Sequence, residues 1–391
     1  MHRYMRHPEQ EETPGDVKNT QLWLCAWIHK SVPIYGIRSY FFRFGRGYII
    51  IHEGRTALKV KEERMESKKK APSDMLVMGS WHVYNRLTLD EGIALVKGAM
   101  ELGITHFDVV DYWDCGILTT IRFKEIMKAL GVPRDKIVIG VKAFPNSVDS
   151  RDDLVRRDLE RLEIDYVDYV LCSRPTQGES IEHAAECMSK LVDDGLTKEL
   201  DMTMWDPAVA RETIDYMKKN GLHTPKCMQF PYNICRRDVV ESDAYVSLFK
   251  EGLKLQAGFT MEGGIFAGHT YRKRFDPEDK AKGIWFPFGE RNLTRDHGGI
   301  REKIVAAVPH IRELAESAGL TPSQFALGFV ATNPYLDSIV FGATKVWQIE
   351  EAIKAVEFAQ KEPELLRKLA DEVGVSGTAI PGYFDYGRFK L

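Results

Sequence analysis

From Met75 onward, short apolar runs alternate with longer amphipathic segments, and this alternation constrains the fold more than any other feature of the chain. In the first unit, MLVMGSW is typical of a buried strand and residues 87–103 are typical of a helix. Thr88 is a suitable N-cap with Glu91 at the third helical position, and Gly103 can end the helix. Roughly eight such units follow one another, whereas open doubly wound sheets usually have about five to seven strands. The pattern therefore predicts an α/β fold that closes into a (β/α)8 TIM barrel.

The same alternation locates each expected element. Strands are expected at 75–81, 104–111, 136–144, 166–173, 198–205, 226–230, 253–259 and 338–341. Helices are expected at 87–103, 121–131, 150–163, 179–195, 207–220, 241–251, 301–318, 322–332 and 346–359. Because barrel enzymes carry their chemistry at the C-terminal ends of the strands, the candidate site residues should stand directly after these strands.

The chain divides into a barrel at 73–375, an extension at 1–72 and a C-terminal tail at 376–391. The extension has 14 basic and 8 acidic side chains, against 40 and 49 in the remainder. Within it, residues 31–55 carry aromatic and β-branched residues that could form a hairpin turning at Gly45 or Gly47.

Two interpretations of this extension differ in function. Its basic and aromatic residues could dock a partner or a single-stranded nucleic acid through stacking and phosphate contacts. Alternatively, it is an extension with little fixed structure, or upstream sequence read from a start codon placed too early, since Met65 and Met75 could both serve. We adopt the second interpretation as the prediction.

Charge and cysteine content exclude several classes of function. The 54 basic and 57 acidic side chains nearly cancel, so nothing favours a nucleic acid or an anionic membrane surface as partner. Six cysteines without a CxxC spacing fit neither a disulfide scaffold nor a zinc ribbon, and no metal site is expected. No apolar run approaches the ~20 residues that span a bilayer, and the N-terminus lacks the order of a secretory signal. We expect a cytoplasmic protein with a small-molecule substrate, no nucleic acid and no membrane insertion; a homo-oligomer is left open.

Two charged residues at neighbouring strand ends are the first candidates for chemistry. Lys142 ends an apolar strand, where a lone ammonium would be costly to desolvate, and Asp108, one strand earlier, is its natural counter-ion. The pair could be a structural salt bridge, or it could lower the pKa of a neighbouring hydroxyl donor. Other polar and aromatic residues at strand ends are Trp81, His82, Asp111, Tyr112, Trp113, Asp114, Ser173, Arg174, Thr203, Met204, Gln229 and Tyr232, with GGIFAG after the seventh strand.

These strand ends resemble the aldo-keto reductase family. In that family an aspartate ends strand 2, a tyrosine follows five positions later and a lysine ends strand 3, and FDVVDYWDCG followed by KIVIGVK is similar. The resemblance extends through DYVDYVLCSRP, KCMQFPYN and FGATKVWQIEEA, and covers about residues 75–360. Within the family, the chain is most similar to the branch of potassium-channel β-subunits and their bacterial relatives, in which the strand-4 segment also runs into an Arg-Pro pair.

The resemblance implies a catalytic tetrad of Asp, Tyr, Lys and His that reduces a carbonyl with hydride from a nicotinamide. Asp108 and Lys142 are retained, but Trp113 stands at the tyrosine position and Ser173 at the histidine position. Tyr112 lies one residue early, an offset that a loop can absorb, so it is the candidate proton donor. The tetrad is therefore degenerate.

The resemblance also implies a site for NADP(H). Gln229 would bind the carboxamide, and Tyr232 would stack on the nicotinamide, although a core aromatic is equally compatible with that position. Where the family has Ser-Asn after strand 5, this chain has Thr203 and Met204. Around the pyrophosphate the backbone N–H groups of Gly263 and Gly264 would serve. Near the C-terminus the expected cofactor residues are Gly342, Thr344, Lys345, Gln348 and Glu351, which offer a helix N-terminus, a hydroxyl and a cation to a 2′-phosphate and favour NADP over NAD.

Three hypotheses follow. The first is an NADP(H)-dependent oxidoreductase that acts on a small carbonyl or alcohol with a rearranged proton donor. The second is a nucleotide-binding barrel that has lost carbonyl reduction and acts as a sensor or subunit. The third keeps Asp108 and Lys142 for proton abstraction or elimination. We adopt the first as the working prediction.

Overall fold

The computed structural model describes residues 39–44, 47–52, 61–62, 70–81, 83–111, 117–146, 148–268 and 300–376. These residues fall into two units, 1–69 and 70–391, and each is considered by itself.

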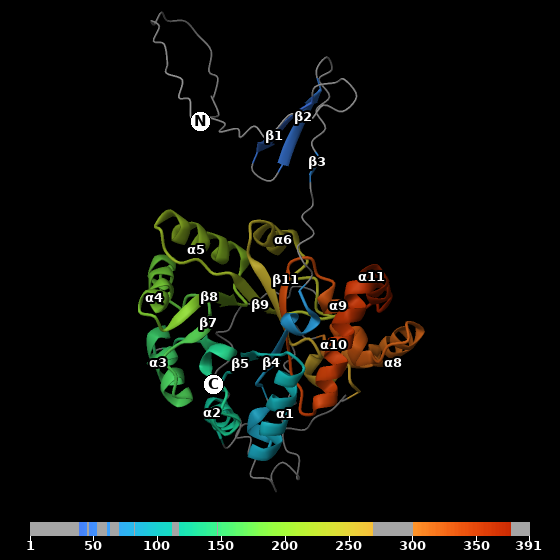
Figure 1. Cartoon of the computed structure of the whole chain (residues 1–391), viewed down its shortest axis with the longest axis horizontal. Helices are drawn as coiled ribbons and strands as arrows, with labels where there is room; N and C mark the ends of the chain where they lie inside the picture. The colour runs from blue at the N-terminus through green and yellow to red at the C-terminus, as the bar shows by residue number, and fades with distance from the viewer. Residues whose placement is uncertain are drawn as a thin grey trace, which may run out of the picture. The chain divides into compact units, whose positions relative to one another are not determined.

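The second unit is a closed barrel of parallel strands surrounded by helices (Figure 1). Its strand order is β10-β11-β4-β5-β6-β7-β8-β9, so chain neighbours pair and β11 closes onto β4. The strands are β4 (Leu76–Gly79), β5 (His106–Asp108), β6 (Val138–Ala143), β7 (Val167–Cys172), β8 (Thr197–Thr203), β9 (Cys227–Pro231), β10 (Lys254–Gly258) and β11 (Leu336–Phe341). The predicted (β/α)8 barrel is confirmed.

The helices cover the outer face of the barrel (Figure 1). They are α1 (Leu89–Glu101), α2 (Thr119–Leu130), α3 (Arg151–Leu162), α4 (Ile181–Asp193), α5 (Pro207–Lys219), α6 (Asp243–Lys250), α8 (Arg301–Ser317), α9 (Pro322–Ala331), α10 (Val346–Lys361) and α11 (Pro363–Glu372). Short 3₁₀ turns lie at η1 (Pro72–Met75), η2 (Tyr84–Arg86), η3 (Arg134–Lys136) and η4 (Glu262–Gly264). Helix α11 is an addition to the elements expected from the sequence.

Local side-chain chemistry explains where the helices begin. Thr88 and Glu91 form the expected capping box at the start of α1, because the Glu91 N–H donates to the Thr88 hydroxyl and the Glu91 carboxylate accepts from the Thr88 N–H. Ser150 and Thr321 cap α3 and α9 in the same way. The caps of α1 and α3 set the point at which the strand-to-helix loops before them end, whereas the cap of α9 ends the turn between α8 and α9.

Polar side chains run through the interior of the barrel, where branched apolar residues are usual. Gln229 Nε2 donates to Gln256 Oε1 at 2.7 Å, and Gln256 Nε2 donates to Ser338 Oγ at 3.1 Å. Tyr169 lies in the same interior and is only 5% exposed. Gly140 makes room for it, since a Cβ at that position would lie 2.0 Å from Tyr169 Cζ. The core is therefore less apolar in its centre than between the strands and helices.

The first unit contains a small antiparallel sheet. Strand β1 (Ser39–Phe44) pairs with β2 (Gly47–His52), with Phe44 opposite Gly47, and β3 (Lys61–Glu62) pairs with β2. The pairing agrees with a hairpin that turns near Gly45 and Gly47, although residues 45–46, like 1–38 and the expected tail at 377–391, lie outside the described residues.

In the described part of the chain, no helix is both long and apolar enough to cross a bilayer.

Deleting residues 1–69 should leave a folded barrel, because every strand and helix of the barrel begins after Lys70. Lys70 itself belongs to the barrel unit, where its ammonium lies 2.7 Å from Asp337 Oδ1 and its carbonyl accepts from Gln360 Nε2. We expect the free energy of unfolding to change by less than about 1 kcal/mol, measured by urea denaturation. A shortened protein that aggregates would show that the extension is part of the core.

Candidate functional site

The centre of the candidate site is a buried ion pair at the C-terminal ends of β5 and β6. Asp108 ends β5 and pairs in register with Gly140, and Lys142 stands two residues further along β6 on the same inner face. Lys142 Nζ lies 3.3 Å from Asp108 Oδ2, with side-chain exposures of 10% and 4%. The structure therefore brings together the two strand-end charges that the sequence pointed to, and each offsets part of the other's cost of burial.

Gln229, at the end of β9, completes the centre from the opposite side of the barrel. Its Nε2 donates to Asp108 Oδ2 at 2.9 Å as well as to Gln256. Asp108 Oδ1 is buried and has no hydrogen-bond partner among the described residues. A buried carboxylate oxygen without a donor is costly, so this atom marks a position where an added donor would be stabilising.

Two loops beside this centre hold non-glycine residues in the left-handed backbone region. Met204 follows β8 with φ 55°, and Phe259 follows β10 with φ 53°; Glu262 has φ 49° and precedes Gly263 and Gly264, at 64° and 95°. Such conformations cost of order 1–3 kcal/mol each and cluster at ligand sites. Both loops lie where the sequence predicted cofactor contacts.

The loop after β10 is held by a buried ion pair. Glu262 is fully buried, and Arg236 donates to its two carboxylate oxygens at 2.7 and 2.6 Å. Asn233 Nδ2 donates to the same carboxylate at 3.0 Å. The carboxylate thus fixes the turn that carries Gly263 and Gly264.

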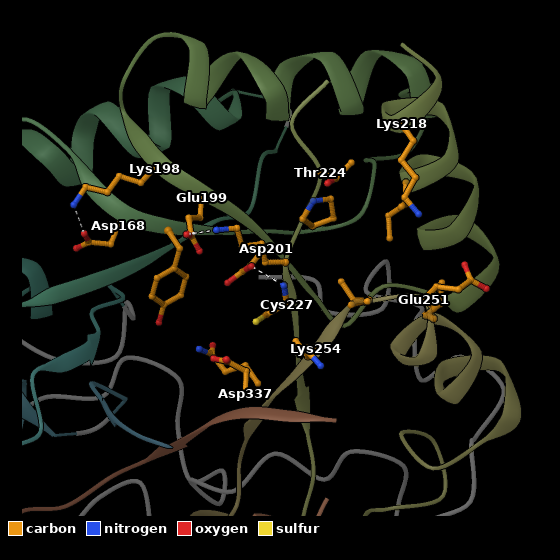
Figure 2. A pocket seen from close by; sticks show the side chains of 18 of the residues that line it. Asp168, Lys198, Glu199, Asp201, Lys218, Thr224, Cys227, Glu251, Lys254 and Asp337 are labelled. Carbon is orange, nitrogen blue, oxygen red and sulfur yellow. Dashed lines mark hydrogen bonds and ion pairs between the residues drawn. The ribbon is translucent and has the colours of Figure 1, made fainter. Parts of the chain in front are cut away.

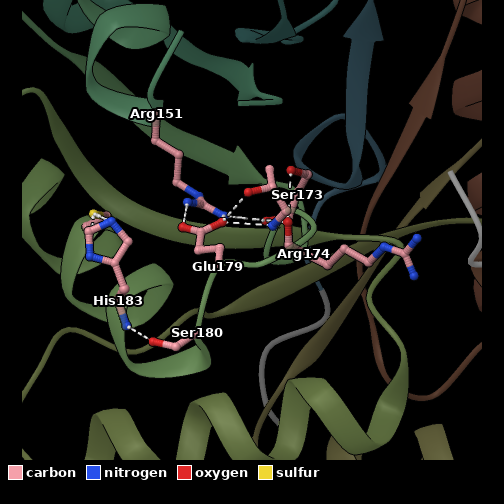
Figure 3. A network of polar contacts seen from close by, with 8 residues as sticks. Arg151, Ser173, Arg174, Glu179, Ser180 and His183 are labelled. Carbon is pink, nitrogen blue, oxygen red and sulfur yellow. Dashed lines mark hydrogen bonds and ion pairs between the residues drawn. The ribbon is translucent and has the colours of Figure 1, made fainter. Parts of the chain in front are cut away.

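The loop after β7 is held by a second ion pair (Figure 3). Arg151 Nη2 donates to the carbonyls of Ser173 and Arg174 at 3.4 and 3.5 Å, and the Arg151 guanidinium pairs with Glu179. Glu179 also accepts from the Thr176 N–H at 2.8 Å. Figure 3 shows the Arg174 side chain extending away from this network, so Arg151 positions the backbone of Ser173 and Arg174 rather than their side chains.

The start of α10 carries the motif expected to bind a 2′-phosphate. Gln348 Oε1 accepts from the N–H groups of Thr344 and Lys345, at 2.8 and 3.1 Å. Lys345 Nζ is 3.7 Å from Glu91 Oε1, and both side chains are about half exposed. Gln348 is thus a helix cap that also accepts from the Thr344 hydroxyl, at 3.4 Å, and the half-exposed Lys345 ammonium is the charged group that can reach an anion.

Three other residues that the sequence assigned to the cofactor site have defined positions in the structure. Glu351 accepts from Thr321 Oγ1 and from Gln324 Nε2, so it ties α10 to α9. Thr203 is buried at the end of β8. Gly342 follows β11, and a Cβ there would lie 3.5 Å from Val83 Cγ2, an ordinary contact.

Tyr232 is fully buried. Its hydroxyl donates to Glu241 Oε1 at 2.6 Å, and its ring lies 5.5 Å from that of Phe329 in α9. These contacts favour the core aromatic over the nicotinamide stack, the two alternatives that the sequence left open.

The proton-donor loop is described only at its start. Asp111 accepts from the Thr120 N–H at 2.9 Å and from Arg161 at 2.8 Å, so this carboxylate caps α2. Tyr112 and Trp113, together with Asp114, Cys115 and His82, lie outside the described residues.

Some residues that shape the site were not anticipated from the sequence. Arg151, Arg236 and Glu262 act through buried ion pairs whose partners are far apart along the chain. Gln256 could have been identified from the sequence. It is a lone polar residue inside the apolar run of β10, and it falls on the face of the strand that points into the barrel.

Comparison with known proteins gives a consistent result. The family model "Aldo/keto reductase family" matches residues 75–371. A "Putative voltage-gated potassium channel subunit beta" from Schizosaccharomyces pombe is 29% identical over 310 residues, which cover 76% of this chain and 88% of that protein. Proteins described as probable voltage-gated potassium channel subunit beta are 27% identical in Oryza sativa subsp. japonica and 28% identical in Arabidopsis thaliana. These two matches cover 76% and 72% of this chain, and 91% and 87% of those proteins.

Proposed function

The chain belongs to the aldo/keto reductase family, and we propose that its barrel is an NADP(H)-dependent oxidoreductase that acts on a small carbonyl or alcohol substrate. The observation that carries the proposal is the buried Asp108–Lys142 pair at the C-terminal end of the barrel, where Asp108 Oδ1 has no donor among the residues that the structure describes. A paired lysine at that end can favour the ionised form of a nearby hydroxyl and so help it exchange a proton.

The residues present fit a bound dinucleotide. Gln229 uses its amide nitrogen on Asp108 and Gln256, which leaves its amide oxygen to accept from a carboxamide. Gly263, in a turn of positive φ, would offer its backbone N–H to a pyrophosphate, whereas the Gly264 N–H donates to the Met261 carbonyl at 2.9 Å within the same turn. Thr203, Gly342, Thr344 and Lys345 complete the set of binding residues, with Gln348 and Glu351 shaping the start of α10.

The bound nicotinamide would supply or accept hydride. Tyr112, in the loop after β5, would hold the proton that the substrate oxygen gains or loses. Lys142 would stabilise the phenolate form of that tyrosine, and Asp108 would keep Lys142 charged and oriented. Ser173, placed by Arg151, would line the site near the substrate oxygen.

The test of this function is NADPH oxidation with a panel of small aldehydes and ketones, preceded by a fluorescence titration of NADPH. Saturable NADPH binding with carbonyl-dependent oxidation is the expected result. Failure to bind either NADPH or NADH would contradict the proposal.

We expect NADPH to bind about ten- to hundredfold more tightly than NADH, because the 2′-phosphate gains charge-assisted contacts with Lys345 and Thr344. Lys345→Glu should reverse the preference, since it places a carboxylate beside both Glu91 and the phosphate. The measurement is the pair of dissociation constants for each variant. Lys354→Glu, an exposed change of the same charge further along α10, is the matched control and should keep the preference. Equal dissociation constants in the parent protein would contradict this assignment.

A nucleotide-binding subunit without carbonyl reduction is the second candidate. It is favoured by Ser173 at the family's histidine position and by the names of the relatives, which describe potassium-channel subunits. Tight NADPH binding without turnover on any carbonyl of the panel would favour this candidate over the first.

A further inference from the structure

A pocket of about 680 Å³ opens at the N-terminal ends of the barrel strands, away from Asp108 and Lys142 (Figure 2). Its inner wall comes from the first residues of β5, β8, β9, β10 and β11, and its outer wall from α5 and α6. Figure 2 shows Asp201, Cys227 and Asp337 on the strands, with Lys218 and Glu251 further out on the helical side. The volume is in the range of pockets that bind small molecules.

Most acidic side chains in this pocket already have a cation. Lys198 lies 2.8 Å from Asp168, Arg211 lies 2.6 Å from Glu251, and Lys70 lies 2.7 Å from Asp337. Glu199 pairs with Lys226. These pairs neutralise the walls of the pocket and leave little net field for an anion.

Asp201 is the exception. It is 5% exposed, and its Oδ1 accepts a hydrogen bond from the Cys227 N–H at 2.8 Å. No cation pairs with it among the described residues. Burial raises the pKa of Asp201 well above its usual range, and the charges of Glu199 and Asp337 act in the same direction. The hydrogen bond from the Cys227 N–H favours its ionised form, and a cation that enters the pocket would favour that form further.

Two further groups at the inner wall have unused polar atoms. The Tyr169 hydroxyl is buried without a partner in hydrogen-bond geometry among the described residues, and nearby Gln256 is engaged with Gln229 and Ser338. His106 Nε2 is likewise buried without a partner, and the rings of His106 and Tyr169 are 5.2 Å apart. Burial lowers the pKa of His106 to about 4, so the imidazole is neutral at pH 7 and can accept a hydrogen bond.

We propose that this pocket is a second ligand site and that it binds a small organic molecule through a primary ammonium group. The ammonium has three N–H donors; the Asp201 carboxylate is its charged acceptor, and Tyr169 and His106, which line the same pocket, carry further acceptor atoms. A metal ion fits less well, because no group of three or more His, Cys, Asp or Glu side chains in the described residues is arranged to hold one. The site is independent of the dinucleotide and of the reaction proposed above.

The test is calorimetric titration of the full-length protein with n-butylammonium chloride at constant ionic strength. Saturable binding with a dissociation constant of about 1 mM is expected for a ligand of five non-hydrogen atoms. Tetramethylammonium, which has the charge but no N–H donor, and 1-butanol, which has no charge, should each bind at least about tenfold more weakly.

Asp201→Asn is the decisive variant, because the amide oxygen can still accept from the Cys227 N–H while the charge is lost. It should weaken butylammonium binding at least about tenfold. Asp215→Asn, which removes an exposed carboxylate at the rim, is the matched control and should keep the affinity within about twofold.

Tyr169→Phe keeps the test decisive if the Asp201 variant does not fold, since the hydroxyl it removes has no partner in hydrogen-bond geometry among the described residues. We expect a three- to tenfold loss of affinity, about one hydrogen bond. Absence of saturable binding, equal binding of butylammonium and 1-butanol, or parent-like affinity in both variants would overturn the proposal. Binding of inorganic phosphate in place of the amine would overturn it too, in favour of an anion site at the rim lysines.

Discussion

Replacing Lys142 with methionine should lower turnover by about a hundredfold or more while the affinity for NADPH stays nearly unchanged. Methionine fills a similar volume but cannot pair with Asp108, 3.3 Å away, or hold a positive charge near the donor hydroxyl. Without that charge a tyrosine would titrate near its unperturbed pKa of about 10 and would exchange protons poorly at neutral pH. The measurement is kcat and the NADPH dissociation constant on a substrate found in the carbonyl panel.

Two comparisons make this result specific. Lys124→Met breaks an ion pair with Glu163 in the outer helical layer and should leave turnover unchanged. Lys142→Met leaves the Asp108 carboxylate buried without its counter-ion. The double variant Asp108→Asn/Lys142→Met has no buried charge at either position, so comparing it with the single variant separates a loss of stability from a loss of turnover. A double variant that is stable and fully active would contradict the role of the pair in catalysis.

The identity of the donor is tested alongside. Tyr112→Phe removes only the acid and its hydrogen bond, so it should match the loss seen with Lys142→Met. Trp113→Tyr restores a hydroxyl at the family position five residues after Asp108. If Tyr112→Phe keeps full activity while Trp113→Tyr creates ketone reduction absent from the parent, Tyr112 is not the donor. The second candidate function, a nucleotide-binding subunit without carbonyl reduction, is then favoured.

The fold could be predicted because its determinants are local and repeated. Alternation of apolar runs and amphipathic helices requires only neighbouring residues to be read, and caps such as Thr88 with Glu91 mark the helix starts within a few positions. Asp108 and Lys142 could be paired in advance because successive strands of a barrel are adjacent, so residues at their ends must meet.

Other parts of the site depend on contacts that the order of the sequence does not reveal. Arg236 and Glu262 meet only because the loops after β9 and β10 fold over one another. The hydrogen bond from Gln229 to Asp108 crosses the interior of the barrel and joins β9 to β5, whereas the bond from Gln229 to Gln256 joins the neighbouring strands β9 and β10. Tyr232 illustrates a second limit of prediction from sequence. A tyrosine that follows a strand can face a ligand or the core, and the sequence alone does not distinguish the two because the packing around the ring determines which one occurs.

The second large effect is expected from Arg236→Met. This change leaves the Glu262 carboxylate fully buried without the Arg236 guanidinium, while the hydrogen bond from Asn233 Nδ2 stays. Removing one partner of a buried ion pair costs about 3–5 kcal/mol, because the other charge stays desolvated. We expect the free energy of unfolding in urea to fall by that amount, whereas Arg156→Met, at an exposed pair with Asp152, should leave the free energy of unfolding nearly unchanged.

Arg236→Met should also weaken the binding of NADPH. Glu262 holds the turn in which Gly263 and Gly264 keep positive φ values, so loss of Arg236 should weaken NADPH binding by about tenfold, or about 1.4 kcal/mol. Arg236→Met/Glu262→Gln removes the buried charge and should recover most of the stability. Because glutamine rebuilds only part of the contact with the loop, the double variant should recover less of the NADPH affinity. If Arg236→Met costs no more stability than Arg156→Met, the carboxylate is not held as a buried charge, and the turn must owe its shape to its glycines alone.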